Sequence, residues 1–450
     1  MVHARERFLV HPPSYLGSRE DPTTRCHCNI WDWDQLRMIK IKGTAKLFSS
    51  DADADEDGYG QVMQRLVFFL SLNILSLDIR AIEIDDDGLI SGFSKDPEDD
   101  DTPFIPYPPF SIVESLAGCR TIKHSKLQDL NRLHPGLDIS TYEDENRIRR
   151  KVAFKFNALG TPQSLQMAWK EMSILKSLPS HPNIVPFDSV VLEDVESRMI
   201  GFTTKYIPGG TLANPKIPFK LEWLKQLTQL VDFLNFDLGI MHQDIAARNL
   251  LIDPDTQKIL LFDFNWAALG KKGFLEGRDD VTGVAFTLYE LITNETGLLS
   301  IPHRERDIEM VQGIPSWTCN RDLDNDVSEF RIFLDEWIEK RTSRGMDPYF
   351  NAPNRIILPL IPTAYNYDIP YELVLDGETI WRTGPRLMRN AMKAGQYCFR
   401  WERPSQSVLK KRACEKKKNR TVLFPTGKAT TEQIIEEILR GKEDERIEIV

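Results

Sequence analysis

The sequence contains few cysteines, and it has neither a long apolar run nor a secretory leader pattern. Six cysteines spread over 450 residues are too few and too scattered for a disulfide-stabilised secreted scaffold. The longest apolar stretch, Leu66 to Leu77, is interrupted by serine and asparagine and is too short to span a bilayer, so we expect no membrane segment. The charged N-terminal sequence lacks the apolar core of a secretory signal, which predicts an intracellular protein.

Basic residues are also in deficit, because the formal net charge is −10. A general nucleic-acid binder needs a basic face for the phosphates, and this charge balance argues against that function. One basic run, Lys410 to Arg420, could serve as a nuclear-localisation signal or as a solvated linker. Because Glu415 interrupts the run and acidic sequence follows it, we favour a linker, and a cytoplasmic location over a nuclear one.

The first part of the chain, residues 1–120, has a pattern of its own. Acidic stretches surround a helix predicted over 62–75, and the pattern of 78–93 predicts two short strands joined at a glycine turn. We therefore expect a small α+β unit here. The proline-rich stretch Thr102 to Phe110 predicts a stiff linker after it, because successive prolines cannot join a sheet ladder.

The remaining chain divides into three further parts. Residues 121–207 contain mostly strand-like segments around one helix, and residues 208–345 are mostly helical. Residues 346–450 form a C-terminal extension with the basic run and a final helix, in which Thr430 and Gln433 make a capping-box pattern.

One short loop, between an apolar helix-like run and an apolar strand-like run, concentrates reactive side chains. The stretch IMHQDIAARNLLID, residues 240–253, carries a carboxylate at Asp244 and a carboxamide at Asn249. Transfer of a phosphoryl group from ATP requires a carboxylate that orients the attacking hydroxyl and oxygen ligands that hold metal ions. Asp244 would accept the proton of the hydroxyl, and Asn249 would supply an amide oxygen to Mg²⁺.

Three further residues complete this requirement. Asp263 ends an apolar strand-like segment, where a carboxylate is well placed to coordinate Mg²⁺. Lys155 lies on a strand of alternating pattern, and Glu171 lies sixteen residues later on a predicted helix. Their pairing would direct the ammonium group toward the phosphates of ATP. Taken singly, each residue could instead form a turn or a surface ion pair.

The order of these motifs resembles that of the eukaryotic protein kinases over about residues 125–340, with degenerate fungal kinase-like proteins as the most similar subgroup. The segments VAFKF, HQDIAARN and DFN are similar to the Val-Ala-Ile-Lys, His-Arg-Asp and Asp-Phe-Gly motifs of that family. The resemblance implies an α+β, bilobal fold that binds ATP and Mg²⁺, with residues 121–207 as its N-lobe and residues 208–345 as its C-lobe.

The resemblance also assigns residues around the nucleotide. The stretch TTKYIPGGTL looks like the hinge between the lobes, so Thr204 would be the gatekeeper. The residues facing the adenine would be Lys205, Tyr206 and Ile207. A helix follows at 279–293, and its starting acid, Asp280, supports the catalytic loop in the family.

The sequence departs from the family pattern mildly at Asn265, which replaces the glycine of Asp-Phe-Gly, and more strongly at three other places. Only Gly136, preceded by Pro135, stands where the family has a glycine-rich phosphate loop, which predicts a weak grip on the nucleotide. Gln243 replaces the arginine that in many kinases binds a phosphorylated activation loop, so we expect no control of that kind. Asp280 follows Asp263 by only seventeen positions, about half the usual stretch, and no Ala-Pro-Glu motif lies between them.

Because protein kinases use that stretch to bind the substrate peptide, three interpretations stay open. The chain is an active kinase with unusual substrate docking, a small-molecule kinase of the aminoglycoside or choline type, or a pseudokinase that acts as a nucleotide-binding or protein-interaction scaffold. The joint retention of the lysine, the glutamate, the asparagine and both aspartates favours an ATP- and magnesium-dependent phosphotransferase that acts on a hydroxyl. Such groups are costly to cluster without a cation to neutralise them.

Overall fold

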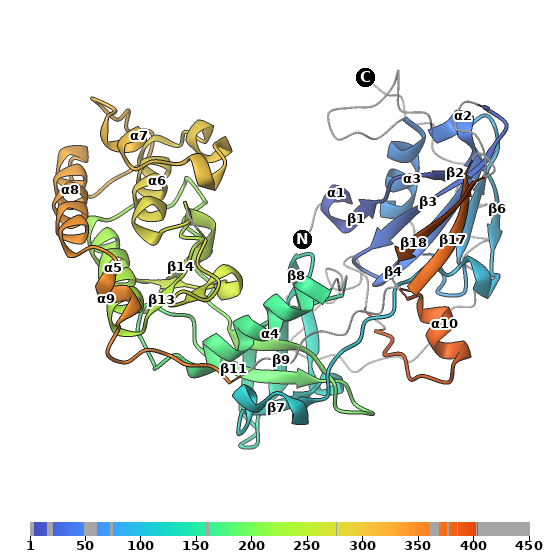
Figure 1. Ribbon diagram of the computed structural model, residues 1–450, viewed down its shortest axis with the longest axis horizontal. Helices are drawn as coiled ribbons and strands as arrows, with labels where there is room; N and C mark the ends of the chain where they lie inside the picture. The colour runs from blue at the N-terminus through green and yellow to red at the C-terminus, as the bar shows by residue number, and fades with distance from the viewer. Residues whose placement is uncertain are drawn as a thin grey trace, which may run out of the picture. The chain divides into compact units, whose positions relative to one another are not determined.

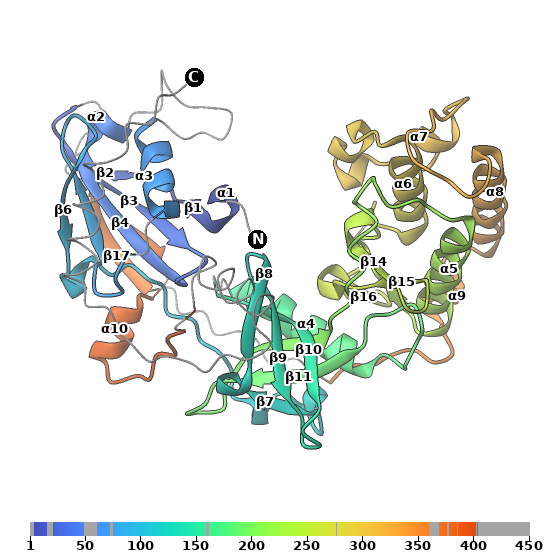
Figure 2. The same cartoon turned by 180° about the vertical axis from the view of Figure 1, so that it is seen from behind.

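The chain forms two compact units (Figures 1 and 2). The computed structural model describes residues 4–15, 21–48, 61–72, 75–158, 162–275, 277–359, 369–375, 378–384, 386–401 and 403. The first unit contains Met1–Phe104, Asp129–Pro135 and Tyr367–Val450, and the second contains Ile105–Gln128 and Gly136–Asn366. The four-part division expected from the sequence remains a prediction, and the expected basic run and final helix lie outside the described residues.

The first unit is built on a mixed sheet in the order β1-β3-β4-β5-β6, with β2 paired to β3. Its strands are β1 (Phe8–Val10), β2 (Ser14–Tyr15), β3 (Arg25–Asp32), β4 (Arg37–Thr44), β5 (Ala81–Ile84) and β6 (Ile90–Ser94). The unit also contains α1 (Ala4–Arg7), α2 (Ala45–Phe48), α3 (Gln61–Leu72), α10 (Met388–Lys393) and a hairpin of β17 (Ile369–Leu375) and β18 (Glu378–Gly384). The predicted helix and strand pair are confirmed as α3, β5 and β6.

Regular apolar spacing explains how this unit closes. Strands β3 and β4 bury Ile30, Ile39 and Ile41 without any exposed surface. Helix α3 buries Leu66 and Leu70, which lie one turn apart, in the same cluster. The first unit therefore has a hydrophobic core of its own, as an independently folding domain requires.

The second unit begins with a sheet that contains β7-β11-β12-β10-β9 in that order. The strands are β7 (Thr121–Lys123), β9 (Leu137–Glu143), β10 (Arg149–Phe156), β11 (Phe187–Leu192) and β12 (Met199–Lys205), and β8 (Gln128–His134) precedes β9. Neighbouring strands pair antiparallel, except that β7 and β11 are parallel. Helix α4 (Pro162–Ser177) follows β10 and buries Leu165, Trp169 and Met172, whose spacing gives the helix one apolar face.

The rest of the second unit is mostly helical and is drawn in light green to orange in Figure 1. Its helices are α5 (Leu221–Asp232), α6 (Asp280–Thr293), α7 (Glu309–Gln312), α8 (Val327–Arg344) and α9 (Asp347–Phe350). Two short ladders pair β13 (Ile240–Met241) with β16 (Ala268–Leu269) and β14 (Leu250–Asp253) with β15 (Lys258–Leu261). The α+β class is confirmed. None of the helices in the described ranges is long and apolar enough to cross a bilayer.

The proline-rich stretch predicted as a linker runs into the second unit, whose first residues, 105–117, we call the strap. The hydroxyl of Tyr107 donates to the carbonyl of Asn157, at the end of β10, at 2.5 Å. The hydroxyls of Ser115 and Ser173 lie 2.7 Å apart and are both buried. Because Ser173 belongs to α4, the strap is attached to the strand and to the helix that carry the site described next.

Candidate active site

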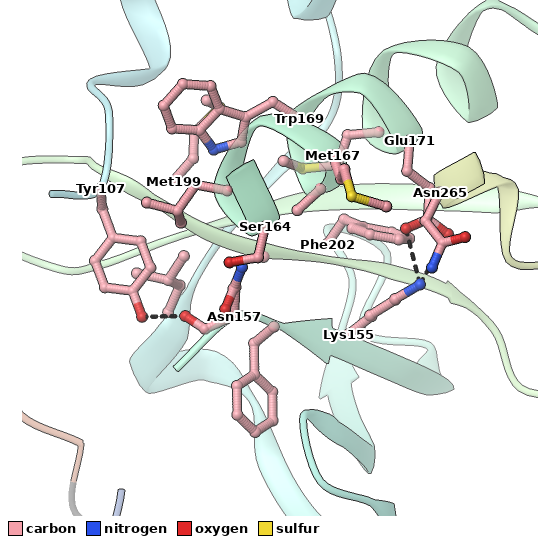
Figure 3. Close-up of a pocket in the computed structure, with 16 residues that line it drawn as sticks. Tyr107, Lys155, Asn157, Ser164, Met167, Trp169, Glu171, Met199, Phe202 and Asn265 are labelled. Carbon is pink, nitrogen blue, oxygen red and sulfur yellow. Dashed lines mark hydrogen bonds and ion pairs between the residues drawn. The ribbon is translucent and has the colours of Figure 1, made fainter. Parts of the chain in front are cut away.

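Lys155 lies at hydrogen-bonding distance from two carboxylates. Its Nζ is 2.8 Å from Oε2 and 3.0 Å from Oε1 of Glu171, and 2.5 Å from Oδ1 of Asp263. Strand β10 carries the lysine between β9 and β12, and Figure 3 shows its side chain extending toward Glu171 on α4. Asp263 follows β15 and has a left-handed backbone, with φ +68°. The structure thus brings together three of the predicted residues from a strand, a helix and a turn.

At both Lys155 and Glu171, burial shifts the pKa in one direction and the neighbouring opposite charge shifts it in the other. Burial raises the pKa of Glu171 to about 7, although the neighbouring Lys155 ammonium opposes the rise. Burial alone would lower the pKa of Lys155, but the carboxylates of Glu171 and Asp263 outweigh it and the net shift is upward. Lys155 is therefore a cation at neutral pH.

The loop after β13 joins Asp244 and Asn249. Nδ2 of Asn249 donates to the backbone carbonyl of Asp244 at 2.9 Å and to its Oδ2 at 2.8 Å. Both amide hydrogens of Asn249 are used in this way, so its amide oxygen is the atom left for a cation. The exposed guanidinium of Arg248 donates to Oδ1 of Asp244 at 2.6 Å. Asp244 is thereby held on two sides.

Asp280 supports the loop that carries Asp244 and Asn249, as the resemblance implied. It is buried at the start of α6 and accepts hydrogen bonds from the backbone amides of His242 and Gln243 at 2.8 and 2.7 Å. Nε2 of His242 lies 3.0 Å from the carbonyl oxygen of Phe262, and its ring packs edge-on against Phe264 at 4.8 Å between centroids. These contacts connect the loop to the residues on either side of Asp263.

The predicted hinge residues lie at the end of β12, where the chain leaves the sheet. Thr204 is half-buried, Lys205 is exposed and Ile207 is buried. The ammonium of Lys151 lies 4.0 Å from the centre of the Tyr206 ring. Contact of these residues with an adenine stays a prediction.

A cavity of about 170 Å³ opens beside the ion pair, between α4 and strands β10 and β12 (Figure 3). Lys155, Glu171 and Asn265 line one end, and Tyr107 and Asn157 lie at the other. The side-chain oxygen of Asn265 is buried and has no hydrogen-bond partner among the described residues. The predicted hinge residues do not line this cavity. The sequence gives no sign of this cavity, because the end formed by Tyr107 and Asn157 comes from the strap and a strand end that carry no motif.

A tight turn occupies the place of the glycine-rich loop. Gly136 has φ +77°, and its carbonyl accepts a hydrogen bond from the amide of Phe156 at 2.9 Å. A Cβ atom at this position would lie 2.9 Å from the carbonyl oxygen of Phe156. Pro135 has no amide hydrogen. The turn therefore offers a phosphate fewer donors than a glycine-rich loop does.

The side chains of Asn249 and Asp263 carry oxygen atoms that suit a hard divalent cation. The amide oxygen of Asn249 and the carboxylate of Asp263 are the ligand types that Mg²⁺ prefers. No group of three or more His, Cys, Asp or Glu side chains that could hold a metal ion occurs among the described residues. A cation here would take its remaining ligands from phosphate and water, which is the usual coordination of Mg²⁺ in nucleotide sites.

Comparisons with known proteins agree with this geometry. Residues 142–295 match the model of the protein kinase domain. The tyrosine-protein kinase hopscotch of Drosophila melanogaster is 28% identical over 183 residues, which are 37% of this chain and 15% of that protein. The casein kinase II subunit alpha' of Saccharomyces cerevisiae is 29% identical over 109 residues, 24% of this chain and 32% of that protein. The tyrosine-protein kinase csk-1 of Caenorhabditis elegans is 28% identical over 171 residues, 36% of this chain and 28% of that protein.

The chain thus spans no more than 32% of the length of these relatives. The kinase match covers the strands and helices that carry Lys155, Glu171, Asp244, Asn249 and Asp263. On these grounds, the second unit of this chain has a divergent protein-kinase-like fold.

Proposed function

We propose that the second unit is an ATP- and magnesium-dependent phosphotransferase that moves the γ-phosphoryl group of ATP to a hydroxyl. The observation that carries the proposal is the contact of one half-buried lysine, Lys155, with two carboxylates from different elements, Glu171 on α4 and Asp263 after β15. A structural ion pair needs a single carboxylate. A second one is explained if a cation and a triphosphate share the site with Lys155.

Each residue has a role in this proposal. Glu171 orients Lys155, whose ammonium would bind the phosphates. Asp244 would orient the substrate hydroxyl and accept its proton, and Asn249 fixes the carboxylate of Asp244 through its amide hydrogens. Asn249 and Asp263 would hold Mg²⁺, which when bound neutralises phosphate charge.

Two alternatives have specific support. The Pro135-Gly136 turn, with few amides for a phosphate, favours a pseudokinase scaffold that binds its nucleotide weakly or not at all. The short stretch from Asp263 to Asp280 favours a small-molecule kinase, because it leaves little chain for docking a peptide.

Thermal unfolding with and without Mg-ATP tests the proposal. ATP at about 100 times its dissociation constant should add about 2.7 kcal/mol to the stability of the wild type when Mg²⁺ is present. Asp263→Ala should remove the magnesium-dependent part of this gain, whereas Asp255→Ala, in the exposed turn between β14 and β15, should keep it. If the wild type shows no gain at any nucleotide concentration, the phosphotransferase proposal is wrong.

Transfer of labelled phosphate separates the remaining interpretations. The full chain is incubated with Mg-ATP and either a mixture of peptides containing serine, threonine and tyrosine, or a set of aminoglycosides and choline. Labelled peptide indicates a protein kinase, and labelled small molecule indicates the other enzyme class. Binding of Mg-ATP without transfer to either set indicates the scaffold. An Asp244→Asn variant controls for contaminating kinases, since it should lose transfer and keep nucleotide binding.

A further inference from the structure

The segment after Asp263 contains no residue that a kinase could phosphorylate. The sequence between Asp263 and Asp280, FNWAALGKKGFLEGRD, has no serine, threonine or tyrosine. Phosphorylation of this stretch on a hydroxyl group therefore cannot order it. In the structure, the stretch is held by contacts within the folded chain. We refer to residues 264–275 as the short segment, to 264–267 and 272–275 as its two limbs, and to 268–271 as its tip.

One side chain supplies three of those contacts. Gln243 is buried, and its Nε2 donates to the carbonyl of Trp266 at 2.7 Å and to the carbonyl of Gly273 at 2.9 Å. Its Oε1 accepts from the backbone amide of Leu275 at 2.6 Å. A single neutral amide thus satisfies two acceptors and one donor on both limbs of the short segment.

The backbone of Gln243 has an unusual conformation that a buried hydrogen bond fixes. Gln243 has φ +64°, a conformation that residues other than glycine rarely adopt. Its amide donates to Oδ1 of Asp280 at 2.7 Å, which fixes this conformation from the buried end of α6. An unusual backbone at a site of three side-chain hydrogen bonds points to a functional constraint.

Further bonds complete the attachment of the short segment. Strand β16 within it pairs with β13, so that Ala268 faces Met241 and Leu269 faces Ile240. The hydroxyl of Tyr349 donates to the carbonyl of Gly270 at 2.8 Å. The tip is therefore tied by backbone pairing and by one tyrosine, whereas the two limbs depend on Gln243.

We propose that Gln243 is a positioning residue that keeps the short segment in its working conformation without any phosphorylation, so that the site is assembled as soon as the chain folds. The inference rests on the proposed phosphotransferase function. Gln243 is thus more than a missing arginine, because its own side chain holds the short segment. Where many kinases use an arginine that binds a phosphate, this chain uses amide hydrogen bonds that need no phosphate.

Hydrogen exchange of the full chain, read by mass spectrometry over the short segment, tests this role. Gln243→Ala should speed exchange there at least tenfold, including the amide of Leu275. Gln243→Glu has nearly the same shape but cannot donate, so it should free the limbs at Trp266 and Gly273 and keep the Leu275 amide protected. Gln312→Ala is the matched control and should exchange as the wild type does, because the side chain of Gln312 donates to the exposed Asp335.

Kinetics distinguish positioning from general stability. Gln243→Ala should lower kcat at least tenfold and leave the KM for ATP and the Mg-ATP thermal shift unchanged, and phosphatase treatment of the wild type should not reduce turnover. Equal exchange in Gln243→Ala and Gln312→Ala would overturn the inference, as would phosphatase-sensitive activity. Should the alanine variant fail to fold, the glutamate variant decides by the same exchange pattern. A wild type without any Mg-ATP shift refutes the enzyme proposal alone, because the exchange result still reports whether Gln243 holds the short segment.

Discussion

Replacing Asp280 tests how the loop carrying Asp244 is held. In the folded protein Asp280 is 1% exposed and accepts three hydrogen bonds: from the amides of His242 and Gln243 at 2.8 and 2.7 Å, and from Nδ2 of Asn235 at 2.9 Å. Asp280→Ala leaves two backbone amides and one side-chain amide buried without this acceptor. Each buried unpaired donor costs about 1–3 kcal/mol, so the second unit should lose about 3–5 kcal/mol of stability.

The neighbouring residue gives a matched control. Asp279 is the N-cap of the same helix, and its side chain accepts one hydrogen bond, from the amide of Thr282 at 2.8 Å. Asp279→Ala should therefore cost only about 1 kcal/mol. Urea unfolding of both variants, followed together with hydrogen exchange over residues 240–253, measures the difference. The explanation fails if Asp280→Ala costs no more than Asp279→Ala, or if the loop exchanges equally in both.

Three further predictions concern the strap, the turn and the ion pair. Ser115→Ala should cost about 1 kcal/mol in thermal unfolding, because it leaves the buried Ser173 hydroxyl without this partner; an unchanged Tm would contradict attachment of the strap. Gly136→Ala should destabilise by about 1–2 kcal/mol, since an alanine at φ +77° is strained and its Cβ meets the carbonyl of Phe156; a neutral result would show that the turn is not as described. The pKa of Glu171, raised to about 7, means that its protonated form stabilises the folded state below about pH 4.5 and that this stabilisation is lost as the pH rises through about 7. Between about pH 5 and 8 the free energy of unfolding of the wild type should fall by on the order of 3 kcal/mol relative to that of Glu171→Gln. Parallel pH profiles of the unfolding free energy in the two proteins would refute the raised pKa of Glu171.

The residues of the ion pair and of the loop could be found from the sequence because each lies within a short motif. Strand and helix patterns place Lys155 and Glu171 on facing elements, and the apolar strand before Asp263 ends where the chain turns. Local spacing also predicted α3 and the strand pair around Gly88. In each case the relevant contacts join residues whose elements have clear periodicity.

Contacts between distant segments without a motif were not predictable in this way. The strap reaches β10 and α4 through Tyr107 and Ser115, across some fifty residues of sequence, and no local pattern marks either residue. The hairpin of β17 and β18 belongs to the first unit although it lies at the other end of the chain. Gln243 was noted only as a missing arginine, since the partners of its amide are backbone atoms that carry no sequence signal.

The central claim is that Lys155, Asn249 and Asp263 converge on one magnesium-bound triphosphate. A crystal structure of the full chain with Mg²⁺ and a non-hydrolysable ATP analogue tests it most directly. In that structure the metal should contact the amide oxygen of Asn249 and the carboxylate of Asp263, and a phosphate oxygen should lie within hydrogen-bonding distance of Nζ of Lys155. A nucleotide bound elsewhere, or a metal that touches neither oxygen, would contradict it.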